Sequence, residues 1–173
     1  DHPAYGMGMF HRLPQTMNAL NYMPESFRTG IGHDYDSHGP EGAVGIERSF
    51  EPWNQNFLVP SVLPKLGSTY EMLKSGAKVA DIGCGSGGAA LLMGRTFPNS
   101  TFDGFDISQF ALDRAEERKK NEGASNVSFY DPRTHAIAQD NSYDIICTFD
   151  CIHDMTRPTD MMKTIRHALQ DDG

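Results

Sequence analysis

The stretch Asp81-Ile82-Gly83-Cys84-Gly85-Ser86-Gly87-Gly88 decides the fold of this 173-residue chain. It follows a short apolar strand predicted over residues 78–82 and leads into a helix rich in Ala and Leu, predicted over residues 86–97. Glycines allow a strand to turn sharply into a helix, and they let a ligand lie against bare N–H groups at the helix N-terminus. The stretch therefore predicts the first strand, loop and helix of a ligand-binding α/β sheet.

Strand and helix patterns continue to alternate after this loop. The remaining expected elements are strands at 101–106, 126–130 and 143–149 and helices at 109–122 and 156–170. This alternation predicts a Rossmann-like, doubly wound α/β fold with a mostly parallel sheet. Such sheets usually have five or more strands, so we expect that the chain holds the first four and lacks the later ones, and that both of its ends are cuts.

Residues 1–76 have a different character, with many Gly, Pro, Met, His and aromatic residues. The absence of a sustained period predicts loops with one short helix near residues 15–22, followed over residues 50–75 by two helical pieces that break at Pro60 and Pro64. We expect two parts: an N-terminal cap or lid at 1–76 and a core domain at 77–173. Aromatic residues of the first part are expected to cover the site or to pack onto the core; these are His33, Tyr35, Phe50, Trp53 and Phe57.

Composition disfavours several classes of protein. A formal charge of -8 disfavours a nucleic-acid partner, because such binding rests on basic side chains that neutralise phosphates. The sequence contains neither an apolar run long enough to cross a bilayer nor a signal-peptide pattern, so we expect no membrane partner and a cytoplasmic location. Three cysteines imply no disulfide framework, and no spacing of His or Cys indicates a metal site.

The glycines of the loop fit two kinds of cofactor. Gly83, Gly85 and Gly88 satisfy the loose G-x-G-x-x-G pattern of dinucleotide-binding proteins. Asp81 separates the alternatives, because it shares a strand face with Val79, where a pyrophosphate-binding strand is expected to be apolar. A buried carboxylate without a partner costs several kcal/mol, so its position implies a cationic partner.

The pattern Asp81-x-Gly83-x-Gly85-x-Gly87 resembles motif I of the class I S-adenosylmethionine (SAM) dependent methyltransferases. The resemblance covers roughly residues 77–173 and implies that SAM is the cofactor and S-adenosylhomocysteine the product. It places further acids at the ends of the next three strands, where ligands bind in open α/β sheets. The residues that it implies for cofactor binding are Asp81, Gly83, Cys84, Gly85, Gly87, Asp106, Ile107, Asp131, Phe149 and Asp150.

The resemblance implies a separate role for each of the site residues along the chain. Asp106 would hold the two ribose hydroxyls, against the alternative that it caps the next helix; Asp131 would accept a hydrogen bond from the adenine amine, against a plain turn role. Phe149 and Asp150 would lie beside the methionyl end of SAM. His153 is the candidate general base, against a structural role for this histidine.

Together these observations predict a SAM-dependent methyltransferase that acts on a small-molecule acceptor, with O-, N- and C-methylation left open. Two alternatives remain: an NAD(P)-dependent oxidoreductase, which leaves Asp81 unexplained, and a non-catalytic SAM-binding protein. A homodimer through the cap or through an exposed sheet edge is also expected.

Overall fold

The computed structural model describes residues 2, 5–171 and 173 and places a four-stranded sheet at the centre of the core. All three strand pairings are parallel, and the order is β3-β2-β1-β4. The strands span Lys78–Ile82 (β1), Thr101–Phe105 (β2), Val127–Tyr130 (β3) and Ile145–Thr148 (β4). The predicted Rossmann-like parallel sheet is confirmed.

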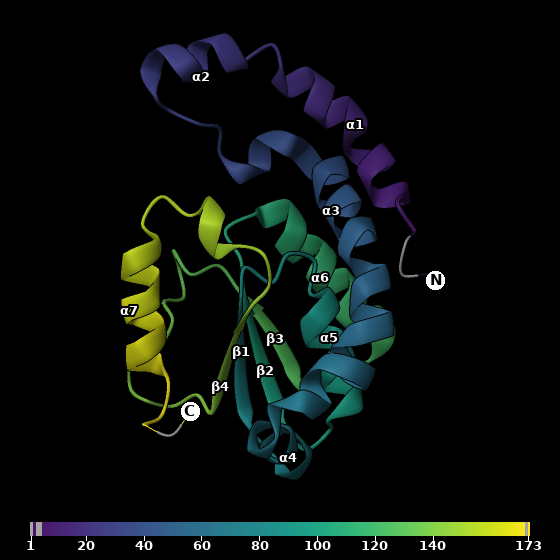
Figure 1. Ribbon diagram of the computed structural model, residues 1–173, viewed down its shortest axis with the longest axis vertical. Helices are drawn as coiled ribbons and strands as arrows, with labels where there is room; N and C mark the ends of the chain where they lie inside the picture. The colour runs from purple at the N-terminus through teal and green to yellow at the C-terminus, as the bar shows by residue number, and fades with distance from the viewer. Residues whose placement is uncertain (1, 3–4, 172) are drawn as a thin grey trace.

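Helices cover both faces of the sheet (Figure 1). On one face lie α5 (Gly88–Thr96) and α6 (Gln109–Glu122), and on the other lies α7 (Pro158–Ala168). Side chains of β1 alternate between two apolar clusters: Val79 joins the cluster under α5, and Ala80 and Ile82 join the one under α7. Strand β1 is therefore buried on both faces of the sheet from Val79 to Ile82.

Helix α6 shows how local sequence sets the boundaries. Ser108 accepts a hydrogen bond from the Ala111 N–H and so caps its start, and Gly123 ends it in the left-handed conformation with a φ of 66°. Arg118 on α6 does not point into solvent. Its side chain is only 14% exposed, because α3 covers this side of α6.

The N-terminal part is more helical than the sequence predicts. Its elements are α1 (Met7–Ala19), α2 (Met23–Thr29), the 3₁₀ turn η1 (Tyr35–His38), α3 (Gly39–Trp53), the π-helix η2 (Asn54–Val62), η3 (Leu63–Leu66) and α4 (Ser68–Ser75). The expected break at Pro60 is wrong, because Pro60 lies inside η2, which continues directly from α3.

Helices α1 and α2 arch over the top of the molecule, α3 runs down beside α5 and α6, and α4 lies at the opposite end of the sheet (Figure 1). Helix α1 packs mainly on α3, and α3 in turn packs on α5 and α6. The 3₁₀ turn η4 (Ile152–Asp154) lies between β4 and α7. No helix within the described residues is both long enough and apolar enough to span a membrane.

Candidate cofactor site

A cavity of about 800 Å³ lies between the carboxyl ends of the strands and the N-terminal segment. Eight of the eleven predicted site residues line it: Asp81, Gly83, Cys84, Gly85, Asp106, Ile107, Phe149 and Asp150. Gly87, Asp131 and His153 are not among the lining residues, although each lies in a segment that borders the cavity. The N-terminal part contributes His33, Tyr35 and Phe50, as expected for a lid, but neither Trp53 nor Phe57.

The glycine loop turns at positions that side chains would obstruct. Gly87 has a φ of 75°, and a Cβ atom there would lie 2.4 Å from the ring of Phe129. Gly83 has a φ of 74°, and a Cβ atom would lie 2.6 Å from the Cβ of Cys151. The N–H groups of Gly83 and Cys84 donate to the Phe105 carbonyl, which fixes the loop against the end of β2. The loop therefore presents bare backbone to the cavity at the start of α5.

Asp81 is the least satisfied polar side chain of the site. It is 2% exposed, and neither carboxylate oxygen has a hydrogen-bond partner among the described residues. Burial, and secondarily the charge of Asp106, raise the pKa of Asp81 to about 7. Because the side chain lines the cavity, a cation bound there would stabilise its ionised form.

Asp106 lies where β2 ends and faces the glycine loop. Its two oxygens accept hydrogen bonds from the N–H groups of Gly85 and Ser108, both at 2.8 Å. Burial raises the pKa of Asp106, and these backbone bonds partly offset the rise. Ser108, rather than Asp106, bonds the N–H of Ala111 as the side-chain cap of α6. Asp106 therefore keeps free acceptor capacity on the cavity side.

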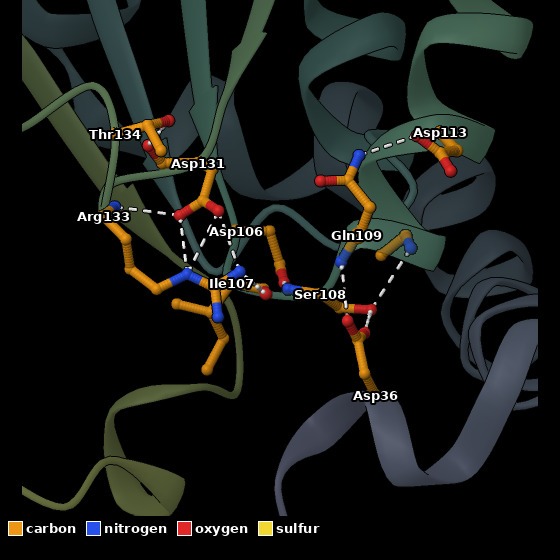
Figure 2. Close-up of polar contacts among 10 residues, drawn as sticks. Asp36, Asp106, Ile107, Ser108, Gln109, Asp113, Asp131, Arg133 and Thr134 are labelled. Carbon is orange, nitrogen blue, oxygen red and sulfur yellow. Dashed lines mark hydrogen bonds and ion pairs between the residues drawn. The ribbon is translucent and has the colours of Figure 1, made fainter.

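Asp131 has a different environment. Its carboxylate accepts from the Arg133 side chain at 2.8 to 3.0 Å and from the Arg133 backbone N–H, and Arg133 also donates to the Ile107 carbonyl (Figure 2). The hydrogen bonds from Arg133 lower the pKa of Asp131. A ligand amine would have to share this carboxylate with the guanidinium.

The segment after β4 carries the remaining predicted residues. The ring centroids of Phe149 and Trp53 lie 6.2 Å apart. Asp150 has a φ of 56°, a conformation that few residues other than glycine adopt. His153 is 62% exposed and lies between two carboxylates, 3.6 Å from Asp150 and 3.3 Å from Asp154. Asp150 and Asp154 line the cavity, whereas His153 lies behind them.

Sequence reasoning missed the charged contact between α3 and α6. Glu47 pairs with Arg114 and Arg118, and Glu51 lies 3.1 Å from Arg118. Burial would raise the pKa of Glu47, but the hydrogen bond from Arg114 and the nearby guanidinium charges lower it overall. Glu47 and Glu51 also line the cavity, so this ion-pair cluster forms the wall beside the glycine loop. Two acids four residues apart and two arginines four residues apart were the signal that could have revealed it.

Together, the parallel sheet and the glycine loop define a class I, Rossmann-like ligand-binding fold with its site at the strand ends. Residues 73–173, more than half of the chain, match the family model described as a methyltransferase domain. The chain therefore belongs to this methyltransferase family, which confirms the resemblance that the sequence indicated and favours it over the oxidoreductase alternative.

One relative of this chain is also a methyltransferase. A malonyl-[acyl-carrier protein] O-methyltransferase from Paenibacillus sp. (strain JDR-2) is 25% identical over 99 residues, which are 56% of this chain and 36% of that protein.

Two solved structures share the fold. A putative sarcosine dimethylglycine methyltransferase from Galdieria sulphuraria has a TM-score of 0.58 at 24% identity, over 72% of this chain and 44% of that one. A putative S-adenosyl-L-methionine-dependent methyltransferase from Methanococcus maripaludis has a TM-score of 0.67 at 14% identity, over 83% of this chain and 64% of that one. The chain thus spans less than two thirds of the length of each of these proteins.

Proposed function

We propose that this chain binds SAM in the cavity and that the protein transfers the methyl group to a small-molecule acceptor. The observation that carries the proposal is Asp81, a buried carboxylate that has no hydrogen-bond partner in the described part of the chain and lines a cavity next to a glycine loop. SAM offers an ammonium group and a sulfonium group, so it supplies the cation that this carboxylate lacks. A pyrophosphate would instead bring negative charge toward Asp81.

The other residues have roles that fit their positions. Asp81 would hold the methionyl ammonium, and the backbone of Gly83, Cys84, Gly85 and Gly87 would lie along the cofactor. Asp106 would accept hydrogen bonds from both ribose hydroxyls, and Ile107, which is 50% exposed, would pack on the adenine. Asp131 would accept from the adenine amine if it shares its carboxylate with Arg133.

Bound SAM supplies a methyl group on a positively charged leaving group. The protein then has to align the acceptor with that methyl group and exclude water, and alignment alone can lower a barrier by several kcal/mol. Phe149 and Asp150 would line the methionyl end, where the acceptor approaches. His153 would take the acceptor proton through Asp150 or Asp154, because it contacts both and does not itself line the cavity.

The charge of the cavity wall limits the kinds of methyl acceptor that are expected to bind. Among the described lining residues there are eight carboxylates and one guanidinium, that of Arg157, which pairs with Asp160 at 2.6 Å. Arg114 and Arg118 neutralise Glu47 and Glu51, and Asp81 would face SAM. The remaining excess of negative charge comes from Asp34, Asp106, Asp150 and Asp154, and it disfavours an anionic acceptor and favours a neutral or cationic one. The carboxylates of the wall are Asp34, Glu47, Glu51, Asp81, Asp106, Asp150, Asp154 and Asp160.

Isothermal titration calorimetry with S-adenosylhomocysteine tests the proposal. We expect saturable binding to the wild-type chain, binding at least tenfold weaker to Asp81→Asn, and unchanged binding to Asp113→Asn, which removes one exposed carboxylate on α6. Absence of heat and of a thermal shift at millimolar ligand would contradict the proposal. Binding of NADH in place of S-adenosylhomocysteine would support the oxidoreductase alternative.

A further inference from the structure

The N-terminal segment is tied to the cofactor site by Asp36. This residue lies in η1, and its carboxylate accepts hydrogen bonds from the Ser108 hydroxyl at 2.6 Å and from the Gln109 N–H at 3.2 Å (Figure 2). The contact joins residues more than 70 positions apart in the sequence. It connects the lid directly to the turn between β2 and α6.

Ser108 relays this contact to Asp106. The Ser108 hydroxyl donates to Asp36, and its backbone N–H donates to Asp106 at 2.8 Å. A change in the position of Asp36 would therefore act, through one residue, on the carboxylate that we assign to the ribose. Asp36 also raises the pKa of Asp106 by charge repulsion, so the two acids are close enough to interact electrostatically.

The start of α6 accounts for the stability of this arrangement. The first N–H groups of a helix lack intrahelical acceptors, and the helix dipole favours negative charge there. Asp36 satisfies the Gln109 N–H, which lies at the start of the 14-residue helix α6. The lid thus supplies an acceptor that the core sequence does not provide at this N–H.

Anchoring Asp36 also sets the position of Tyr35. Tyr35 lines the cavity, and burial raises the pKa of its hydroxyl, with further contributions from the charges of Asp154, Asp106 and Asp150. Tyr35 therefore lies between the end of β2 and the segment after β4. Gly30 and Gly39 border this part of the chain with φ of 71° and 66°, and a Cβ atom at either would meet no neighbour within 4 Å.

We propose that Asp36 is a cofactor-positioning residue that couples closure of the lid over the cavity to binding of the ribose by Asp106. The inference rests on the proposed function and on the hydrogen bonds that connect Asp36, Ser108 and Asp106. When Asp36 holds Ser108, Tyr35 covers the cavity and Asp106 is held toward the glycine loop. Without the hydrogen bonds of Asp36, neither the lid nor the Asp106 carboxylate is held in this position.

A double-mutant cycle tests the coupling with S-adenosylhomocysteine as the probe. We expect Asp36→Ala to weaken binding about tenfold, which is within the usual range of coupling between sites. Combined with Asp106→Asn, it should weaken binding by clearly less than the product of the two single effects, because both changes affect one relay. Asp36→Asn keeps one acceptor oxygen and should lose less than Asp36→Ala, and Asp113→Asn, on the same helix, should lose nothing.

Hydrogen–deuterium exchange separates positioning from a purely structural role. In the wild-type chain the ligand should protect both residues 83–88 and residues 30–39; in Asp36→Ala it should protect only the first. If Asp36→Ala does not fold, the same comparison is made with Asp36→Asn. Failure of the wild-type chain to bind contradicts the proposed function, whereas wild-type binding together with equal affinity and equal protection in the Asp36 variants overturns this inference alone.

Discussion

The sheet core and the first two helices differ in how they use apolar residues. In the core, Leu91 and Phe102 are at most 1% exposed, whereas Phe10 on α1 and Phe27 on α2 are 71% and 82% exposed. Burial of apolar surface therefore fixes the core, whereas α1 is held by its packing on α3, and η1 by polar contacts such as those of Asp36. Equivalent substitutions in the two regions should have very different effects.

The largest difference is expected for two glycines of positive φ. Gly87→Ala in the core should destabilise the protein by about 2 to 6 kcal/mol, because backbone strain adds to a clash with Phe129. Gly30→Ala meets no neighbour and should cost about 1 kcal/mol, from strain alone. Urea unfolding of both variants measures the difference, and equal losses would contradict the distinction between the two regions.

Apolar truncation is the next comparison. Leu91→Ala should cost about 2 to 5 kcal/mol, because it leaves a cavity in the cluster under α5. Phe27→Ala should change the stability by less than about 0.5 kcal/mol, because the ring is already in solvent. Chemical denaturation followed by far-UV circular dichroism reports both values. A large loss for Phe27→Ala would show that α2 is packed in solution.

Ionisation of the buried Asp81 lowers the stability of the core at neutral pH. Its pKa is about 7 in the folded chain and about 4 when unfolded, so between these values the unfolded state loses its proton first and stability falls as pH rises. Below about pH 4 both states are protonated, and above about pH 7 the loss is constant, on the order of 4 kcal/mol. Asp81→Asn should therefore match the wild-type chain below about pH 4 and exceed its stability near pH 8.

Urea unfolding of the two chains without ligand, over that pH range, measures the effect. Asp113→Asn serves as the control and should follow the wild-type curve. A difference between wild type and Asp81→Asn that does not change with pH would show that folding does not shift the pKa of Asp81.

The smallest difference in stability is expected for substitutions in two ion pairs. Arg118→Met should cost about 1 to 3 kcal/mol, because it leaves Glu51 without its guanidinium partner, and Glu47 with Arg114 alone, in a half-buried contact. Glu25→Gln, which removes a fully exposed pair with Arg28, should leave the unfolding midpoint unchanged at any salt concentration. Thermal unfolding at low and high salt distinguishes the two outcomes, and equal shifts would contradict the proposed burial of the α3–α6 contact.

The same contrast explains what the sequence could predict. Strand β1, the loop and α5 follow from apolar runs and glycines that act locally, and Ser108 and Gly123 mark the ends of α6 by their own backbone chemistry. The N-terminal part has no such periodicity, so loops were expected over the first part of α1 and most of α3, where helices form. Pro60 was expected to break a helix, but the wider turn of the π-helix accommodates it.

The site divides in the same way. Residues at strand ends, such as Asp81 and Asp106, were predicted because parallel strands bring their carboxyl ends together. The contacts of Asp36 with Ser108 and of Glu51 with Arg118 were not, because each joins residues more than 60 positions apart. The bidentate hold of Arg133 on Asp131 is local, yet the sequence indicated only a turn beside Pro132.

The unpartnered carboxylate of Asp81 also links ligand binding to proton release. With a pKa of about 7, it is largely protonated near pH 6, and a bound ammonium group would require it to ionise. Binding near pH 6 should then release close to one proton per ligand, and binding above about pH 8 should release almost none. The heat of binding would consequently depend on the ionisation enthalpy of the buffer, and affinity would rise with pH. Asp81, which destabilises the ligand-free protein, would thus make binding of the ligand in the cavity depend on pH.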